Sequence, residues 1–99
     1  MRVLQVRVTD DVVILEGDID MAVADDVRDA IEEAARSGAR VVDLSGVTFM
    51  DSSGLRALLL TGKAMNGNGP LVLRDASRQV RRLFDVVIPE GAPGLEIRP

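Results

Sequence analysis

The amino-acid sequence predicts an α/β fold in which helices pack against a mixed β-sheet. Strand-like and helix-like patterns alternate along most of the chain, an order typical of parallel strands joined by helical crossovers. Two strand-like runs separated by a short turn open the chain, so an antiparallel hairpin is expected at one edge of the sheet. The 99 residues are 46% hydrophobic, which is enough for one core and indicates one domain over residues 1–99.

The opening hairpin is expected from strands over residues 3–8 and 12–16. Polar and apolar residues alternate in the first run, as in a half-buried strand, and the second run is apolar. The turn Thr9-Asp10-Asp11 lies between them. The segment 17–20 is expected to break the second strand.

A first helix is expected after this break, with Asp20 as its N-cap because a carboxylate can accept hydrogen bonds from the first free N–H groups. Gly38 suits the left-handed position just after the helix. Apolar residues recur between these limits at helical spacing: Val23, Val27, Ala30, Ile31 and Ala34.

The second half of the chain repeats the order of strand and helix. A short apolar strand is expected over residues 41–44, and a helix begins after Ser52. Gly62 is expected to weaken this helix by about 1 kcal/mol relative to alanine, and residues 66–70 end it. The remaining elements are a strand over 71–73, a helix capped by Ser77 with Val80, Leu83, Phe84 and Val87 on one face, and a last strand over 95–97.

Composition argues against several classes of function. The chain contains no histidine and no cysteine, which removes the usual general base, thiolate chemistry and the commonest metal ligands, so we expect no enzyme, metal or cofactor. Only two aromatic residues and a net charge of −4 argue against a nucleic-acid partner. No apolar run approaches the ~20 residues needed to span a bilayer, so we expect a cytoplasmic protein without a membrane partner.

The charges are unevenly distributed. Eight acidic residues and one base, Arg28, lie between Glu16 and Glu33, whereas four arginines and one acid lie between Arg74 and Arg82. These runs are interpreted as solvated helix faces, including the arginines at 78, 81 and 82. The alternative is a partner surface of complementary sign.

One segment carries most of the functional information. Residues 43–55 read Asp-Leu-Ser-Gly-Val-Thr-Phe-Met-Asp-Ser-Ser-Gly-Leu, in which a strand is followed by a short loop and a serine pair where a helix begins. A phosphate at that point would meet free backbone N–H groups and the positive end of the helix dipole. Without a histidine to activate them, Ser52 and Ser53 do not read as hydrolase nucleophiles.

This segment closely resembles the signature of STAS domains, and specifically of bacterial anti-sigma factor antagonists. The residues Gly17-Asp18-Ile19-Asp20 match the turn of that family before its first helix, and Arg82-Leu83-Phe84-Asp85 resembles its third-helix segment. The resemblance covers residues 3–88 and implies a single layer of helices on the mixed sheet. Many members carry a further C-terminal helix, which is expected to be missing here. A segment over residues 86–94, with Pro89 and Pro93, also replaces the usual continuation of the third helix.

The resemblance implies a partner-switching cycle. The unphosphorylated antagonist binds an anti-sigma factor that is itself a serine kinase, and this binding frees a sigma factor. Phosphorylation of Ser52, the acceptor by motif position, releases the antagonist, and a metal-dependent phosphatase of the PP2C type resets it. The alternative is a STAS module that acts as a scaffold or as the small soluble subunit of a stress-sensing or transport assembly. We expect a monomer or a weak homodimer.

Several residues near Ser52 have both a structural and a functional interpretation. Asp51 is either an N-cap or a group that orients Ser52 or contacts the metal of the kinase. Ser53 is a cap or a first-turn hydroxyl, and the alternative is that Ser53 is itself phosphorylated. Gly54 lets another backbone approach closely. The expected partner-binding set is Asp18, Asp20, Asp51, Ser52, Ser53 and Gly54.

Overall fold

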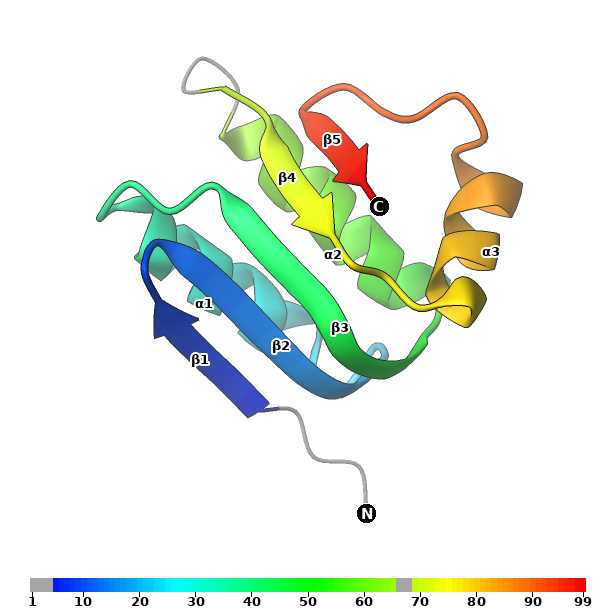
Figure 1. Cartoon of the computed structure of the whole chain (residues 1–99), viewed down its shortest axis with the longest axis horizontal. Helices are drawn as coiled ribbons and strands as arrows, with labels where there is room; N and C mark the ends of the chain where they lie inside the picture. Colours follow the sequence, from blue (N-terminus) through cyan, green and yellow to red (C-terminus); the bar gives the residue numbers. More distant parts are fainter. Residues whose placement is uncertain (1–4, 66–68) are drawn as a thin grey trace.

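Five strands form one sheet in the spatial order β1-β2-β3-β4-β5 (Figure 1). The computed structural model describes residues 5–65 and 69–99, so residues 3–4 of the first expected strand and residues 66–68 of the expected turn lie outside the description. The elements are β1 (Gln5–Thr9), β2 (Val12–Ile19), α1 (Ala24–Ala35), β3 (Val41–Met50), α2 (Ser52–Ala64), β4 (Leu71–Arg74), α3 (Arg78–Val87) and β5 (Leu95–Arg98).

The sheet is mixed, as the sequence predicted. Strands β1 and β2 pair antiparallel through a turn in which Asp10 and Asp11 both have positive φ, the geometry of a tight hairpin turn. The pairs β2–β3, β3–β4 and β4–β5 are all parallel. The α/β fold with an opening hairpin is therefore confirmed.

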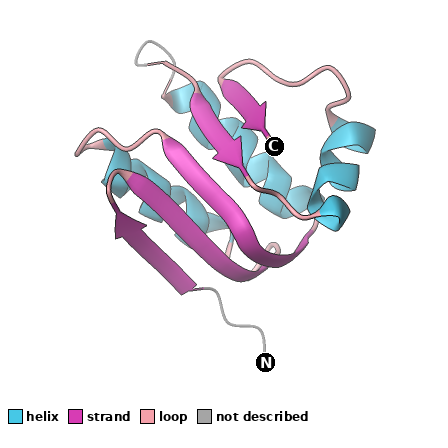
Figure 2. Ribbon diagram, in the orientation of Figure 1, coloured by secondary structure: helices cyan, strands magenta, loops and turns pink. Residues whose placement is uncertain are grey.

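The helices build one core against the sheet. In Figures 1 and 2, α1 and α2 lie behind the strands, and α3 stands beyond β4 and β5. Helix α1 directs Val27 and Ile31 into the core, and α3 directs Val80 and Phe84 there. Val87, expected on this inward face, is 46% exposed instead because α3 ends at that residue. Among the described residues the helices number three, so the expected absence of a fourth agrees with the structure.

Strands β2 and β3 are both longer than the sequence predicted. The segment expected to break β2 continues it to Ile19, because Gly17 takes a φ of 110° and absorbs a register shift rather than ending the pairing. Strand β3 likewise runs past Leu44 to Met50, pairing with β2 as far as Ile19. The expected loop between this strand and α2 therefore shrinks to one residue, Asp51.

Asp20 is not the N-cap of α1, which corrects the sequence-based prediction. The helix begins at Ala24 with Val23 as its N-cap and no side-chain cap hydrogen bond. The Oδ1 of Asp20 instead accepts from the backbone N–H of Ala22 at 3.0 Å and so holds the turn between β2 and α1. The longer β2 and this additional turn move the start of the helix beyond the reach of the carboxylate.

An acid and a base face each other on β3 and β4. Asp43 and Arg74 are register partners, and Nη2 of Arg74 lies 3.5 Å from Oδ2 of Asp43. The backbone N–H of Ser45 donates to Oδ1 of Asp43 at 2.8 Å. Burial raises the pKa of the Asp43 carboxyl, but the hydrogen bonds from Ser45 and the charge of Arg74 outweigh it, so the pKa lies below its ordinary value.

Replacing Asp43 with asparagine should therefore have a pH-dependent cost. Because folding lowers this pKa, the ionised carboxylate stabilises the fold above its ordinary pKa of about 3.9, and the contribution is lost as the pH falls through the lower folded-state value. Arg74 is 41% exposed, so we expect Asp43→Asn to lose no more than about 1 kcal/mol at pH 7. Urea unfolding from pH 7 to pH 2.5 should show that the difference in unfolding free energy between the parent and Asp43→Asn narrows below pH 4. A difference that stays constant over this range would contradict a lowered pKa for Asp43.

Candidate functional site

The serine pair lies in the first turn of α2, where this helix follows directly from β3. Asp51 is the single residue between the two elements, and its backbone N–H donates to the carbonyl of Ile19 at 3.2 Å. This bond fixes the beginning of α2 beside the end of β2. Ser52 is exposed and Ser53 is half-buried. The hydroxyl of Ser52 is thus presented by a helix rather than by the loop that the sequence predicted.

Asp51 is the N-cap of α2, the structural interpretation that the sequence offered for it. Its backbone is extended, and its Oδ1 accepts from the backbone N–H of Gly54 at 3.0 Å. Ser53 is consequently a first-turn residue and not the cap. The carboxylate is held at the helix terminus beside Ser52 by this hydrogen bond.

The capping role can be measured with two substitutions at this residue. Asp51→Ala should lower the free energy of unfolding by about 1 kcal/mol, because Gly54 N–H loses its acceptor. Asp51→Asn keeps an acceptor oxygen and should lose less than half of that amount. Urea unfolding at pH 7 tests both, and equal losses in the two variants would show that the charge rather than the cap stabilises the helix.

Gly54 is buried against the protein's own strands. A Cβ at this position would lie 2.7 Å from both Cγ2 and the carbonyl oxygen of Ile19, and 3.0 Å from Cγ of Met50. The close approach that glycine permits is therefore that of α2 to β2 and β3. Gly54 therefore positions α2 against the sheet and is itself too buried to contact a partner.

The two acids near the end of β2 are placed differently from each other. Oδ1 of Asp18 accepts from the hydroxyl of Thr48 at 2.7 Å, and its side chain is partly exposed. Asp20 is only 8% exposed and holds the turn described above. Little of the Asp20 side chain is therefore open to a partner, whereas Asp18 remains accessible.

A groove between α1 and α2 adjoins the serine pair and was missed from the sequence. Its volume is about 410 Å³, and Met21 and Leu60 beside it are 76% and 51% exposed. The residues that line it are Met21, Ala24, Asp25, Arg28, Ser53, Arg56, Ala57 and Leu60. One sequence signal was available, since Leu60 lies outside the inward positions of its helix. We call this feature the α1–α2 groove.

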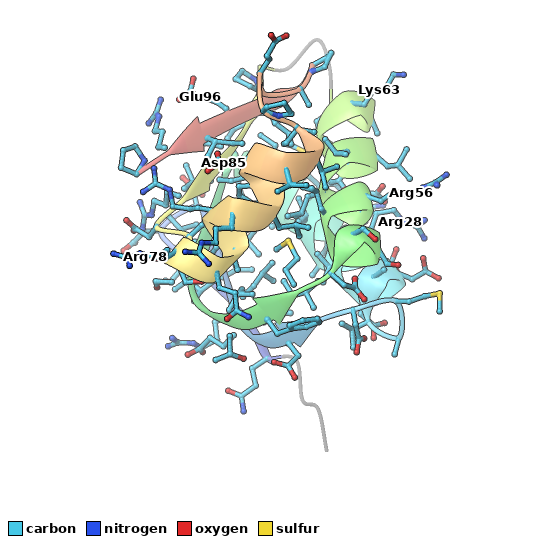
Figure 3. All side chains as sticks on the ribbon, turned by 90° about the vertical axis from the view of Figure 1, so that its right-hand side faces the viewer. Arg28, Arg56, Lys63, Arg78, Asp85 and Glu96 are labelled. Carbon is cyan, nitrogen blue, oxygen red and sulfur yellow. The ribbon has the colours of Figure 1, made fainter. Side chains whose placement is uncertain are left out.

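Two arginines stand at the groove, as Figure 3 shows. Arg28 on α1 lies 3.7 Å from a carboxylate oxygen of Asp25 and 3.5 Å from one of Asp29. Arg56 on α2 forms no ion pair within residues 5–65 and 69–99. The three arginines of α3 are exposed, as expected.

Two classes of site find no support in the described part of the chain. No group of three or more histidine, cysteine, aspartate or glutamate side chains there could hold a metal ion. None of the helices described is both long and apolar enough to cross a bilayer.

Comparison with known proteins identifies the family. A family model described as "Mlab, STAS domain" matches residues 4–88. The chain belongs to the STAS-domain family. This STAS domain is 36% identical over 74 residues to the STAS-domain containing protein PA14_20770 of Pseudomonas aeruginosa, and the match covers 73% of each chain.

The fold of this STAS domain also resembles solved structures. An anti-sigma factor antagonist from Mycobacterium paratuberculosis superposes with a TM-score of 0.75 at 23% identity, over 100% of this chain and 86% of the other. The unphosphorylated anti-sigma factor antagonist SpoIIAA superposes with a TM-score of 0.62 at 24% identity, over 95% and 87% of the two chains. The arrangement of strands and helices in this STAS domain is therefore shared with those proteins.

Proposed function

We propose that this STAS domain is an anti-sigma factor antagonist regulated at Ser52. The unmodified domain binds an anti-sigma factor with serine-kinase activity, and this binding frees a sigma factor. Phosphorylation of Ser52 then releases the domain from the anti-sigma factor. The observation that carries the proposal is the position of Ser52: it is exposed in the first turn of α2, next to a groove flanked by exposed Met21 and Leu60. Family membership and the shared fold support it.

The geometry suits a switch that leaves the fold intact. An exposed hydroxyl is accessible to a kinase, and a phosphate there adds a charge of about −1.5 to −2 at neutral pH. Free N–H groups of the first helical turn partly stabilise that charge in the isolated domain. In a docked interface the same charge is desolvated, so binding weakens while folding is retained. A PP2C-type phosphatase, acting on the exposed phosphoserine, would complete the cycle.

Asp18, Asp51, Ser52 and Ser53 form the proposed contact surface together with the α1–α2 groove. Asp18 and Ser53 are partly exposed, and Asp51 lies directly beside Ser52. Gly54 and Asp20 contribute by positioning the helix and the turn, through the packing and hydrogen bond described above.

The proposal is tested by incubating the purified domain with an anti-sigma kinase from the same organism and ATP, and mapping phosphate by mass spectrometry. Modification at Ser52, lost in Ser52→Ala and retained in Ser53→Ala, is the expected result. Absence of both binding and modification by every such kinase would refute the proposal.

A second candidate is a constitutive subunit of a stress-sensing or transport assembly. The exposure of Met21 and Leu60 supports it as much as it supports the first candidate, because exposed apolar side chains mark a contact surface whether or not Ser52 is modified. Affinity capture from native cells, repeated with Ser52→Ala, separates the candidates. Stable recovery of the same assembly with both chains, and no kinase among its subunits, would favour this second function.

A further inference from the structure

The α1–α2 groove carries positive charge on an otherwise acidic protein. The chain has a net charge of −4, yet the groove is lined by two arginines and a single carboxylate, that of Asp25. Arg28 and Arg56 project on the same side of the molecule from the two facing helices (Figure 3). The groove therefore favours an anionic group in the space next to Ser53.

The two arginines are not equally available to an anion. Arg28 already has the carboxylates of Asp25 and Asp29 within 3.7 Å. Arg56 has no ionic partner among the residues that the structure describes. The nearest acidic residue before it in the sequence is Asp51, whose carboxylate accepts from the backbone N–H of Gly54. Of the two arginines, Arg56 is therefore the one whose guanidinium is available to bind an added anion.

Arg56 stands one helical turn after Ser52. Side chains four residues apart on a helix lie on the same face, with Cβ atoms about 5–6 Å apart. Both residues are exposed within the continuous helix α2, so neither has to leave a packed position to meet the other. A guanidinium can bind two oxygens of one phosphate at once. The hydroxyl of unmodified Ser52 has a single neutral oxygen and cannot form this paired contact.

We infer that Arg56 is the internal receptor of a phosphate on Ser52, and that this pairing changes the sign of charge that the α1–α2 groove offers to a partner. Unmodified, the groove presents Arg56 to a partner segment that carries a carboxylate beside an apolar side chain, the latter contacting Met21 and Leu60. Modified, the phosphate takes the guanidinium and leaves excess negative charge at the same place. This inference rests on the proposed function, since it concerns how modification of Ser52 is read.

The other charges at this corner act in known directions on such a phosphate. Asp51 at the N-cap and Asp18 and Asp20 on either side of Ile19 oppose the second ionisation of the phosphate, because they add negative charge near it. On the α1 side of the groove, the negative charge of Asp25 opposes the second ionisation of the phosphate, and the positive charge of Arg28 favours it. Of the cations on α2, Arg56 is the one that lies within a single helical turn of Ser52, so its removal should have the largest single effect.

The test uses the full chain with phosphoserine incorporated at position 52 during translation, so that no kinase is needed. The second pKa of the phosphate is measured by ³¹P NMR titration in the parent, in Arg56→Gln and in Arg82→Gln, a matched control on the exposed face of α3. Arg56→Gln should raise this pKa by about 0.3 unit or more, the shift that corresponds to an i,i+4 ion pair. Arg56→Lys should recover part of the shift, and 1 M salt should reduce it.

A pKa that stays within 0.1 unit of the parent value in Arg56→Gln, or that moves equally in Arg82→Gln, would overturn the inference. A shift produced by Arg28→Gln alone would also overturn it, because the receptor would then be on α1. Thermal unfolding of each variant confirms that the fold is retained. The proposed function fails by a separate result, namely no kinase that binds or modifies the unphosphorylated chain.

Discussion

Replacing Gly62 by alanine should destabilise the domain by about 2 to 3 kcal/mol, the cost of overpacking a well-filled site. A Cβ on Gly62 would lie 2.7 Å from both the carbonyl oxygen of Gly94 and Cδ2 of Leu95. That carbonyl cannot withdraw freely, because it accepts from the backbone N–H of Leu71 at 2.9 Å. The substitution therefore forces α2 away from the start of β5.

The sign of this effect makes it diagnostic. Helix propensity alone predicts the opposite sign, namely that alanine at position 62 stabilises α2 by about 1 kcal/mol. This is the effect expected for Gly62 from the sequence. Lys63→Ala is the matched control: it places the same residue one position along, on the exposed side of the helix, and should change the free energy of unfolding by less than about 0.5 kcal/mol. Urea unfolding measures both. A stabilised Gly62→Ala would show that the contact with Gly94 does not constrain the helix.

Under the proposed function, phosphorylation of Ser52 should weaken binding to the anti-sigma kinase at least 100-fold. That factor corresponds to about 2.7 kcal/mol, at roughly 1.4 kcal/mol for each factor of ten, and one desolvated like-charge contact is of this size. Ser52→Ala should bind as the parent does and should stay bound when ATP is added. Ser52→Glu should weaken binding in the same direction but less, because it carries a single charge.

Titration calorimetry with the kinase and a non-hydrolysable ATP analogue measures these affinities. Ser37→Glu provides the matched control, since it adds the same charge at an exposed serine after the far end of α1. Its affinity should remain within threefold of the parent value. If phosphorylated Ser52 and unmodified Ser52 bound with equal affinity, the release step of the proposal would be wrong.

Local patterns in the sequence were sufficient for the order of elements and for part of the site. Apolar residues at helical spacing located α1 and α3, the serine pair after an apolar strand located the beginning of α2, and the cap position of Asp51 was among the interpretations offered. The longer strands were not foreseen, because Gly17 reads as a breaker until the pairing of β2 with β3 absorbs its positive φ. The role of Asp20 changed for the same reason.

The α1–α2 groove could not be predicted from any single segment. Met21 lies in the turn before α1 and Leu60 lies on α2, so the groove that they line exists only once these two segments are brought together. The same holds for Gly62, whose contact with Gly94 is formed by residues 32 positions apart. Periodicity reports which face of a helix is inward, but it does not report the distance to the next helix.

The hydrogen bond from Asp51 to Ile19, with the buried Gly54 beside it, has a consequence for timing. It joins the residue before Ser52 to the end of β2, where the buried Ile19 pairs with Met50 of β3, and we expect backbone amides at this packed junction to exchange slowly with solvent. Under the proposed function, the phosphate on Ser52 is a covalent ester, which motions of the domain do not hydrolyse, and the packed junction keeps the first turn of α2 in one arrangement before and after modification. The lifetime of each state would then be set by the enzymes that add and remove the phosphate, and the domain would act as a one-bit memory.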